Sequence, residues 1–321
     1  MAARRFVLSL RAKEMGGGAV AAQLYRLPTG QSPPTPTAEN FAAQLASSRL
    51  ARLTPDQASD ALRGRTLFLV HGFNVSRSRG LWSGEEVAGQ PLAYDAVVAV
   101  LWPGDSASIG PLVYPKVLSA ARDSAAPFAA FLADHLGAGG DVSFATHSFG
   151  VRVVLETLRQ LLAGGRAGRV RFTDAIFMAA ADDHAVFQDA RYRAVTEAFA
   201  RFVVLSSFGD DVLKRVYPLG DWFEDLLHRD ERGDQRALGR YGPTLKAGAP
   251  VNGKVAWFEV DPAVDHGHDH YLPWPWETLA QYAGGWNDKR IRVRDFMAGA
   301  AGGRTPRIDR IEGPKPPRIE A

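Results

Sequence analysis

The chain has 321 residues, 46% of them hydrophobic, and its 38 basic and 35 acidic side chains leave a formal net charge of +3. This composition is that of a globular protein, and the spread of the basic residues along the chain predicts neither a nucleic-acid partner nor a polybasic membrane patch. Cysteine is absent, which excludes disulfides, thiolate catalysis and cysteine metal sites.

The first sixty residues differ in pattern from the rest of the chain. The run RRFVLSLR at 4–11 predicts a strand, and the proline-rich run LPTGQSPPTPTAE at 27–39 interrupts regular structure. We therefore expect residues 1–60 to form an N-terminal extension packed on a core domain at 61–300. The apolar run FVLSL is too short for a signal-peptide core, and no later run reaches membrane-spanning length, so we expect a cytoplasmic protein.

From residue 65 onwards, apolar runs alternate with amphipathic segments. The runs rich in Val, Phe, Leu and Ile are TLFLV at 66–70, DAVVAVLW at 95–102, DVSFAT at 141–146, DAIFMAA at 174–180, RFVVLSS at 201–207 and KVAWFEV at 254–260. Most are apolar on both faces, which is typical of strands covered by helices on each side. The alternation predicts an α/β fold with a mostly parallel central sheet and helices on both faces.

Two segments break this alternation. Residues 214–250 form a charged insert that contains several aromatic side chains and precedes the last predicted strand. Residues 301–321 are rich in glycine, proline and charge, which predicts a flexible C-terminal tail.

Reactive side chains follow four of the predicted strands. Ligands of parallel sheets gather at the carboxyl ends of the strands, so these positions indicate a site. In chain order they are HGFN at 71–74, THSFG at 146–150, GDD at 209–211 and DHGHDHY at 265–271. The order predicts an oxyanion loop, then a serine, an aspartate and a histidine.

Ser148 is the predicted nucleophile. A serine hydroxyl is weak until a base takes its proton, and a sharp strand-to-helix turn is needed to present it. Gly150 gives room for such a turn on one side, whereas Thr146 stands where the G-x-S-x-G pattern has glycine. The alternative interpretation is a serine that only caps the following helix.

The neighbouring residues have predicted supporting roles. The backbone amides of Phe73 and Phe149 are the candidate oxyanion hole. We expect His71, Gly72 and Gly150 to shape the site. For His147, next to the nucleophile, we expect packing or substrate contact beside the pocket.

Several motifs together resemble those of α/β-hydrolases over residues 60–275. They are VHGFN at 70–74, LWPGD at 101–105, THSFG at 146–150, AAADDHAVF at 179–187 and ALGRYGP at 237–243. Within that superfamily the chain resembles a largely uncharacterised bacterial group with HGFN, WPS and HSMGN motifs. The resemblance implies the fold, an esterase-type serine mechanism and a triad in the order Ser-Asp-His. The sequence departs from the group at Thr146, and at Phe149 and Gly150, where the group tends towards Met-Gly-Asn.

Asp210 is the favoured acid, because it follows the fifth predicted strand and matches the acid loop of such hydrolases. Asp211 is one step away. Asp182 and Asp183, after the fourth predicted strand, occupy the other place from which the superfamily draws its acid.

His268 is the favoured base, because GHDHYL at 267–272 looks like the catalytic-histidine loop of related hydrolases. His266 and His270 stay open as alternatives. The clustered histidines and aspartates also suggest a divalent metal, but no second ligand cluster is evident, and we predict no metal.

The sequence thus predicts a serine hydrolase of the carboxylesterase or lipase kind. It would cleave an ester or related acyl bond of a small molecule through an acyl-enzyme, without a cofactor. A non-catalytic binding module on the same fold and an acyltransferase are the alternatives. The sequence indicates neither the acyl-chain length nor the oligomeric state.

Overall fold

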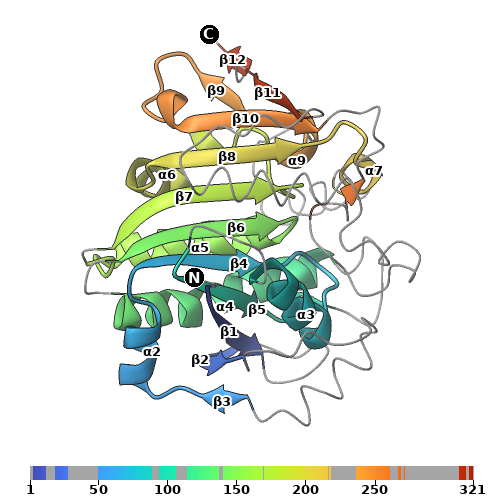
Figure 1. Ribbon diagram of the computed structural model, residues 1–321. Coiled ribbons are helices and arrows are strands. Elements are labelled where there is room, and N and C mark those ends of the chain that lie inside the picture. The colour runs from blue at the N-terminus through green and yellow to red at the C-terminus, as the bar shows by residue number, and fades with distance from the viewer. Residues whose placement is uncertain are drawn as a thin grey trace.

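A computed structural model describes residues 3–11, 19–27, 50–88, 94–105, 114–136, 140–168, 170–215, 217, 236–260, 267–268, 271, 311–315 and 318–320. Its centre is a mostly parallel sheet of ten strands, in the order β11-β10-β8-β7-β6-β4-β5-β1-β2-β3 (Figure 1). The strands of this sheet are β1 (Arg4–Arg11), β2 (Ala19–Arg26), β3 (Ala51–Arg52), β4 (Arg65–Val70), β5 (Ala96–Leu101), β6 (Asp141–His147), β7 (Arg171–Met178), β8 (Arg201–Ser206), β10 (Val255–Val260) and β11 (Ile311–Lys315). The predicted α/β fold class is confirmed.

Helices fill the connections between the parallel strands. They are α2 (Pro55–Ala61), α3 (Arg77–Ala88), α4 (Tyr114–His135), α5 (Gly150–Ala163), α6 (Arg193–Ala198), α7 (Asp211–Arg215) and α9 (Leu238–Tyr241). Helices α4 and α5 pack against each other, and α3 packs against β5 and β1. Helix α4 contains Pro127 in its interior.

The core lies where the apolar runs of the sequence meet these helices. All six residues of β5 are buried, as are the last six of β6. Phe68 of β4, Phe144 of β6 and Phe128 of α4 form an aromatic cluster with ring centroids 5.5 to 6.3 Å apart. Because these strands are buried on both faces, their sequences are continuously apolar.

The N-terminal strands extend the sheet. Strand β1 pairs in parallel with β5, with Arg4 opposite Ala96, and β2 and β3 follow in antiparallel pairing. The sequence predicts β1 but not β2, in which Leu24 is the only buried residue of eight. A strand with so little buried apolar surface carries almost no pattern that sequence analysis can detect.

The other end of the sheet contains later parts of the chain. In the segment 214–250, for which the sequence predicts an insert, the structure describes the C-terminal end of α7, helix α9 and strand β9 (Thr244–Lys246). Strand β11 pairs antiparallel with β10, and β12 (Arg318–Glu320) pairs with β9. Strands β11 and β12 thus lie in a stretch for which the sequence predicts a flexible tail.

The parallel strands β4, β6, β7, β8 and β10 all end at the same edge of the sheet. Helices α7 and α9 lie beside the end of β8, whereas α6 lies beside its beginning (Figure 1). Chain segments that follow β4, β6 and β8 therefore meet at this carboxyl edge.

Candidate active site

Residues 146–150, which we call the elbow, turn the chain sharply from β6 into α5. Ser148 has a positive φ of 51°, in the left-handed region that non-glycine residues rarely occupy. Its amide donates to the carbonyl of Met178 at 3.0 Å, and its carbonyl accepts from the amide of Ala181 at 3.3 Å. The backbone of the next strand's end therefore holds the strained turn in place.

The side chain of Ser148 does not cap α5, as the alternative interpretation would require. Helix α5 begins at Gly150 with Phe149 as its N-cap residue, and no side-chain hydrogen bond caps it. The Ser148 hydroxyl instead lies 2.9 Å from Nε2 of His268.

Two glycines bring the elbow against the end of β4. A Cβ at Gly150 would lie 2.5 Å from the carbonyl oxygen of Val70 and 2.8 Å from that of His71. A Cβ at Gly72 would lie 2.8 Å from Cβ of Ser148. Any larger residue would push these backbones apart, so glycine allows this close approach.

Three side chains from distant parts of the chain form a continuous hydrogen-bonded chain. Oγ of Ser148 lies 2.9 Å from Nε2 of His268, and Nδ1 of His268 lies 2.8 Å from Oδ2 of Asp210. Ser148 is 4% exposed and Asp210 is fully buried. The structure thus brings together the three residues that the sequence singles out as nucleophile, base and acid.

Asp210 is held differently from its neighbour Asp211. It ends the acid loop, as we call residues 207–210, and its Oδ1 accepts from the amide of Leu213 at 2.8 Å, as an N-cap of α7 does. Asp211 is mostly exposed, and its carboxylate lies 3.4 Å from Arg215. The buried carboxylate therefore faces the imidazole, and the exposed one faces a surface guanidinium.

The other two acid candidates are engaged elsewhere. Asp182 lies 3.6 Å from the guanidinium of Arg152 and accepts from the amide of Asp183. Asp183 accepts from the amide of Ala185 at 2.7 Å. The alternative base candidates, at 266 and 270, lie outside the described residues.

His71 shapes the loop after β4. Its Nδ1–H donates to the carbonyl of Gly72 at 2.8 Å, and its Nε2 accepts from the amide of Trp102 at 3.3 Å. Burial lowers the pKa of His71 from 6.5 to about 3, because no water reaches the ring to solvate a charge. His71 is therefore neutral at ordinary pH, and both its ring nitrogens serve the backbone of this edge.

For His147 the sequence predicts packing or substrate contact beside the pocket, and the structure adds a contact with the base. Its Nε2–H donates to the backbone carbonyl of His268 at 2.8 Å, and the two rings lie 4.9 Å apart. Tyr271, three residues further on, is fully buried, with its ring 6.3 Å from that of His147. The residue next to the nucleophile thus contacts the segment that carries His268.

Phe73 and Phe149, whose backbone amides are the candidate oxyanion hole, lie side by side. Their rings meet edge to face with centroids 6.5 Å apart. Phe149 lies at the N-terminus of α5, where the unpaired amides of a helix and its dipole favour negative charge. The assignment of these two amides to an oxyanion hole stays a prediction.

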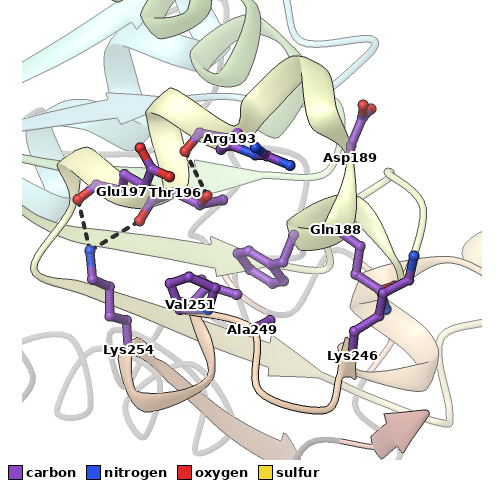
Figure 2. Close-up of a pocket in the computed structure, with 11 residues that line it drawn as sticks. Gln188, Asp189, Arg193, Thr196, Glu197, Lys246, Ala249, Val251 and Lys254 are labelled. Atoms are coloured by element: carbon purple, nitrogen blue, oxygen red, sulfur yellow. Dashed lines mark hydrogen bonds between the residues drawn. The ribbon is translucent and has the colours of Figure 1, made fainter. Parts of the chain in front are cut away.

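A pocket formed by described residues lies away from these side chains. It encloses about 420 Å³ along α6 and the segment leading into β10, near the beginnings of the parallel strands. Figure 2 shows Lys254 at one end of it, donating to the backbone carbonyls of Thr196 and Glu197. A molecule in this pocket would not reach Ser148, so we assign it no part in the site.

The part of the chain that the structure describes contains neither a metal-binding cluster nor a membrane-spanning helix. No group of three or more His, Cys, Asp or Glu side chains lies close enough there to hold a metal ion. No helix described there has both the length and the hydropathy to cross a membrane.

Part of the chain matches a known protein family. Residues 53–219, just over half of the chain, match the model of a family described as "Alpha/beta hydrolase of unknown function (DUF900)". The match contains Ser148 and Asp210 and ends before α9 and His268. No curated protein was found to match.

Proposed function

Because the chain belongs to this DUF900 family of α/β hydrolases, we propose that it is a serine hydrolase that cleaves an ester or related acyl bond. Ser148 is the nucleophile, His268 the general base and acid, and Asp210 the carboxylate that orients His268. The observation that supports this proposal is the hydrogen-bonded chain from the Ser148 hydroxyl through both nitrogens of His268 to the buried carboxylate of Asp210. A serine that only stabilised the fold would need no such chain.

In the first half-reaction, Nε2 of His268 takes the hydroxyl proton while Oγ of Ser148 attacks the acyl carbonyl. The resulting imidazolium keeps its Nδ1–H on Asp210, whose charge stabilises it. The same proton then passes from Nε2 to the leaving alcohol as the tetrahedral intermediate collapses to an acyl-enzyme.

In the second half-reaction, a water molecule gives its proton to Nε2 of His268 and attacks the acyl group. The proton then passes from Nε2 to Oγ of Ser148 as the bond between Oγ and the acyl group breaks, which releases the acid and restores the serine hydroxyl. Throughout, the negative oxygen of each tetrahedral intermediate would accept hydrogen bonds from the amides of Phe73 and Phe149. These steps use side chains and backbone of the chain alone.

A fluorophosphonate tests the proposal without a guess at the substrate, because it phosphonylates an activated serine and leaves an unactivated one unchanged. Wild type, Ser148→Ala and Ser143→Ala would each be exposed to the reagent, and the intact masses compared. Ser143 is the matched control, since it lies on the same strand and its hydroxyl bonds to Thr173. We expect a single adduct on wild type and on Ser143→Ala and none on Ser148→Ala. Folded wild type without an adduct, or an adduct that survives Ser148→Ala, would overturn the proposal.

A further inference from the structure

Residues 237–242, within the motif ALGRYGP, pack against the acid loop although the family match ends before them. The amide of Gly239 donates to the carbonyl of Ala180 at 2.9 Å, and its carbonyl accepts from the amide of Ser207 at 3.0 Å. A Cβ at Gly239 would lie 2.2 Å from the backbone of Ala179. This segment therefore lies tightly between the chain that follows β7 and the chain that follows β8.

Arg240 reaches from this segment to the acid itself. It is only 5% exposed, and its Nη1–H donates to the backbone carbonyl of Asp210 at 2.7 Å. Its guanidinium carbon lies 4.5 Å from the ring centroid of Phe208 and 5.5 Å from that of Tyr241. A charge-assisted hydrogen bond and two aromatic faces fix this guanidinium in one orientation. Helix α9, which carries Arg240, lies at the end of β8 in Figure 1.

The contacts of Asp210 show what Arg240 adds. Each polar atom of Asp210 has a partner. Its backbone amide donates to the carbonyl of Ser207, and its backbone carbonyl accepts from the amide of Lys214 and from Arg240. In its carboxylate, Oδ1 accepts from the amide of Leu213 and Oδ2 faces His268. The partners at Ser207, Leu213 and Lys214 are backbone atoms of the same turn and would move with it. Arg240 is a side chain from another part of the chain, so it fixes this turn relative to the rest of the sheet.

We propose that Arg240 is the positioning residue of the triad: it holds the acid loop so that the Asp210 carboxylate meets Nδ1 of His268. The inference rests on the proposed function for its effect on reactivity. Without Arg240 the turn that carries Asp210 can shift, and Oδ2 of Asp210 then loses its hydrogen bond with Nδ1 of His268. A displacement of about 1 Å at a catalytic group lowers a rate on the order of a hundredfold.

The rate of fluorophosphonate labelling of Ser148 tests this in three variants. We expect Arg240→Met to slow labelling roughly tenfold to a hundredfold, and Arg240→Lys to recover part of the rate, since lysine keeps the charge but not the planar fork. Arg201→Met is the matched control. Arg201 pairs with Asp174 at the opposite end of β8, and we expect wild-type labelling from that variant.

The decisive comparison is a double-mutant cycle with Asp210→Ala. If Arg240 acts through Asp210, Arg240→Met will slow labelling no further once the carboxylate is gone. Equal slowing in both backgrounds would show a merely structural role for Arg240 and overturn the proposal, as would wild-type labelling by Arg240→Met. Melting temperatures of all variants show whether a slow labelling rate reflects unfolding. If Arg240→Met is unfolded, the cycle is run with Arg240→Lys in its place.

A crystal structure of the Arg240 variant separates this proposal from the proposed function, because it does not depend on any reactivity. We expect the 2.8 Å contact between Nδ1 of His268 and Oδ2 of Asp210 to be broken in Arg240→Met. An unchanged contact would overturn the positioning role even if Ser148 is a working nucleophile. A broken contact in a protein whose wild type takes no adduct would leave the positioning role standing and the hydrolase proposal rejected.

Discussion

The elbow follows β6 and the acid loop follows β8, both at the carboxyl edge of the sheet. The two segments are held in place in different ways. The elbow is held by backbone contacts, with Gly72 and Gly150 allowing β4 and α5 to touch. The acid loop is held by a side chain from another segment, Arg240, and its carboxylate meets a histidine 58 positions away. The nucleophile is thus placed by backbone contacts, whereas the acid and the base are held mainly by side-chain hydrogen bonds.

This difference predicts two kinds of failure. Changes at the elbow should cost stability, because backbones that touch cannot move apart cheaply. Changes around Asp210 and His268 should cost reactivity while leaving most of the stability intact. The following variants test that division, beginning with the one for which we expect the largest effect.

Asp210→Asn should slow fluorophosphonate labelling roughly a thousandfold or more. The amide group can donate to Nδ1 of His268, which would place the ring proton on Nε2 and leave no lone pair to accept the Ser148 proton. Asp211→Asn is the control, because Asp211 is exposed and faces only Arg215. Equal rates for the two variants would contradict the assignment of the acid.

Gly150→Ala should lower the free energy of unfolding by about 3 kcal/mol, since overpacking of a tight site costs that much. Its new methyl group would lie 2.5 Å from the carbonyl oxygen of Val70. Gly253→Ala is the matched control, with no atom within 4 Å of its Cβ, and should change stability by less than about 0.5 kcal/mol. Chemical denaturation measures both, and similar values would refute the close approach.

His147 lies in the elbow and contacts the segment that carries the base, so its variants sharpen the comparison. His147→Ala removes the hydrogen bond to the His268 carbonyl and should slow labelling by up to about tenfold, the worth of one such bond. His147→Gln keeps a donor of similar reach and should be slowed less. If His147→Ala labels as fast as wild type, the contact does not position the base.

The smallest effect concerns the pH dependence of stability at His71. Its pKa is about 3 when folded and 6.5 otherwise, so below pH 6.5 only the unfolded chain takes up this proton. Stability therefore rises with pH between about 3 and 6.5, and its loss from pH 7 to 5.5 is about 1 kcal/mol. His71→Gln should remove that part of the loss, as denaturation at both pH values would measure. An unchanged loss would mean that His71 is not neutral in the folded chain.

The sequence indicates a structural feature when the physical cause of that feature lies in neighbouring residues of the chain. The apolar runs indicate six strands of the sheet because burial on both faces leaves a continuous pattern, and Ser148 is indicated by the short elbow around it. Arg240 lies in the motif ALGRYGP, but the motif does not indicate its role, since an arginine in a charged segment looks like a surface residue until its contact with Asp210 is seen. The same holds for His147, whose partner lies 121 positions away.

The most direct test of the account is the rate of fluorophosphonate labelling of wild-type protein as a function of pH. An imidazole accepts the Ser148 proton only when it is neutral, so the account predicts a rate that rises across the range in which histidine loses its proton, near pH 6.5 for an unperturbed ring, and then levels off. A rate that stays flat from acid to alkaline pH in folded protein would contradict a serine activated by His268.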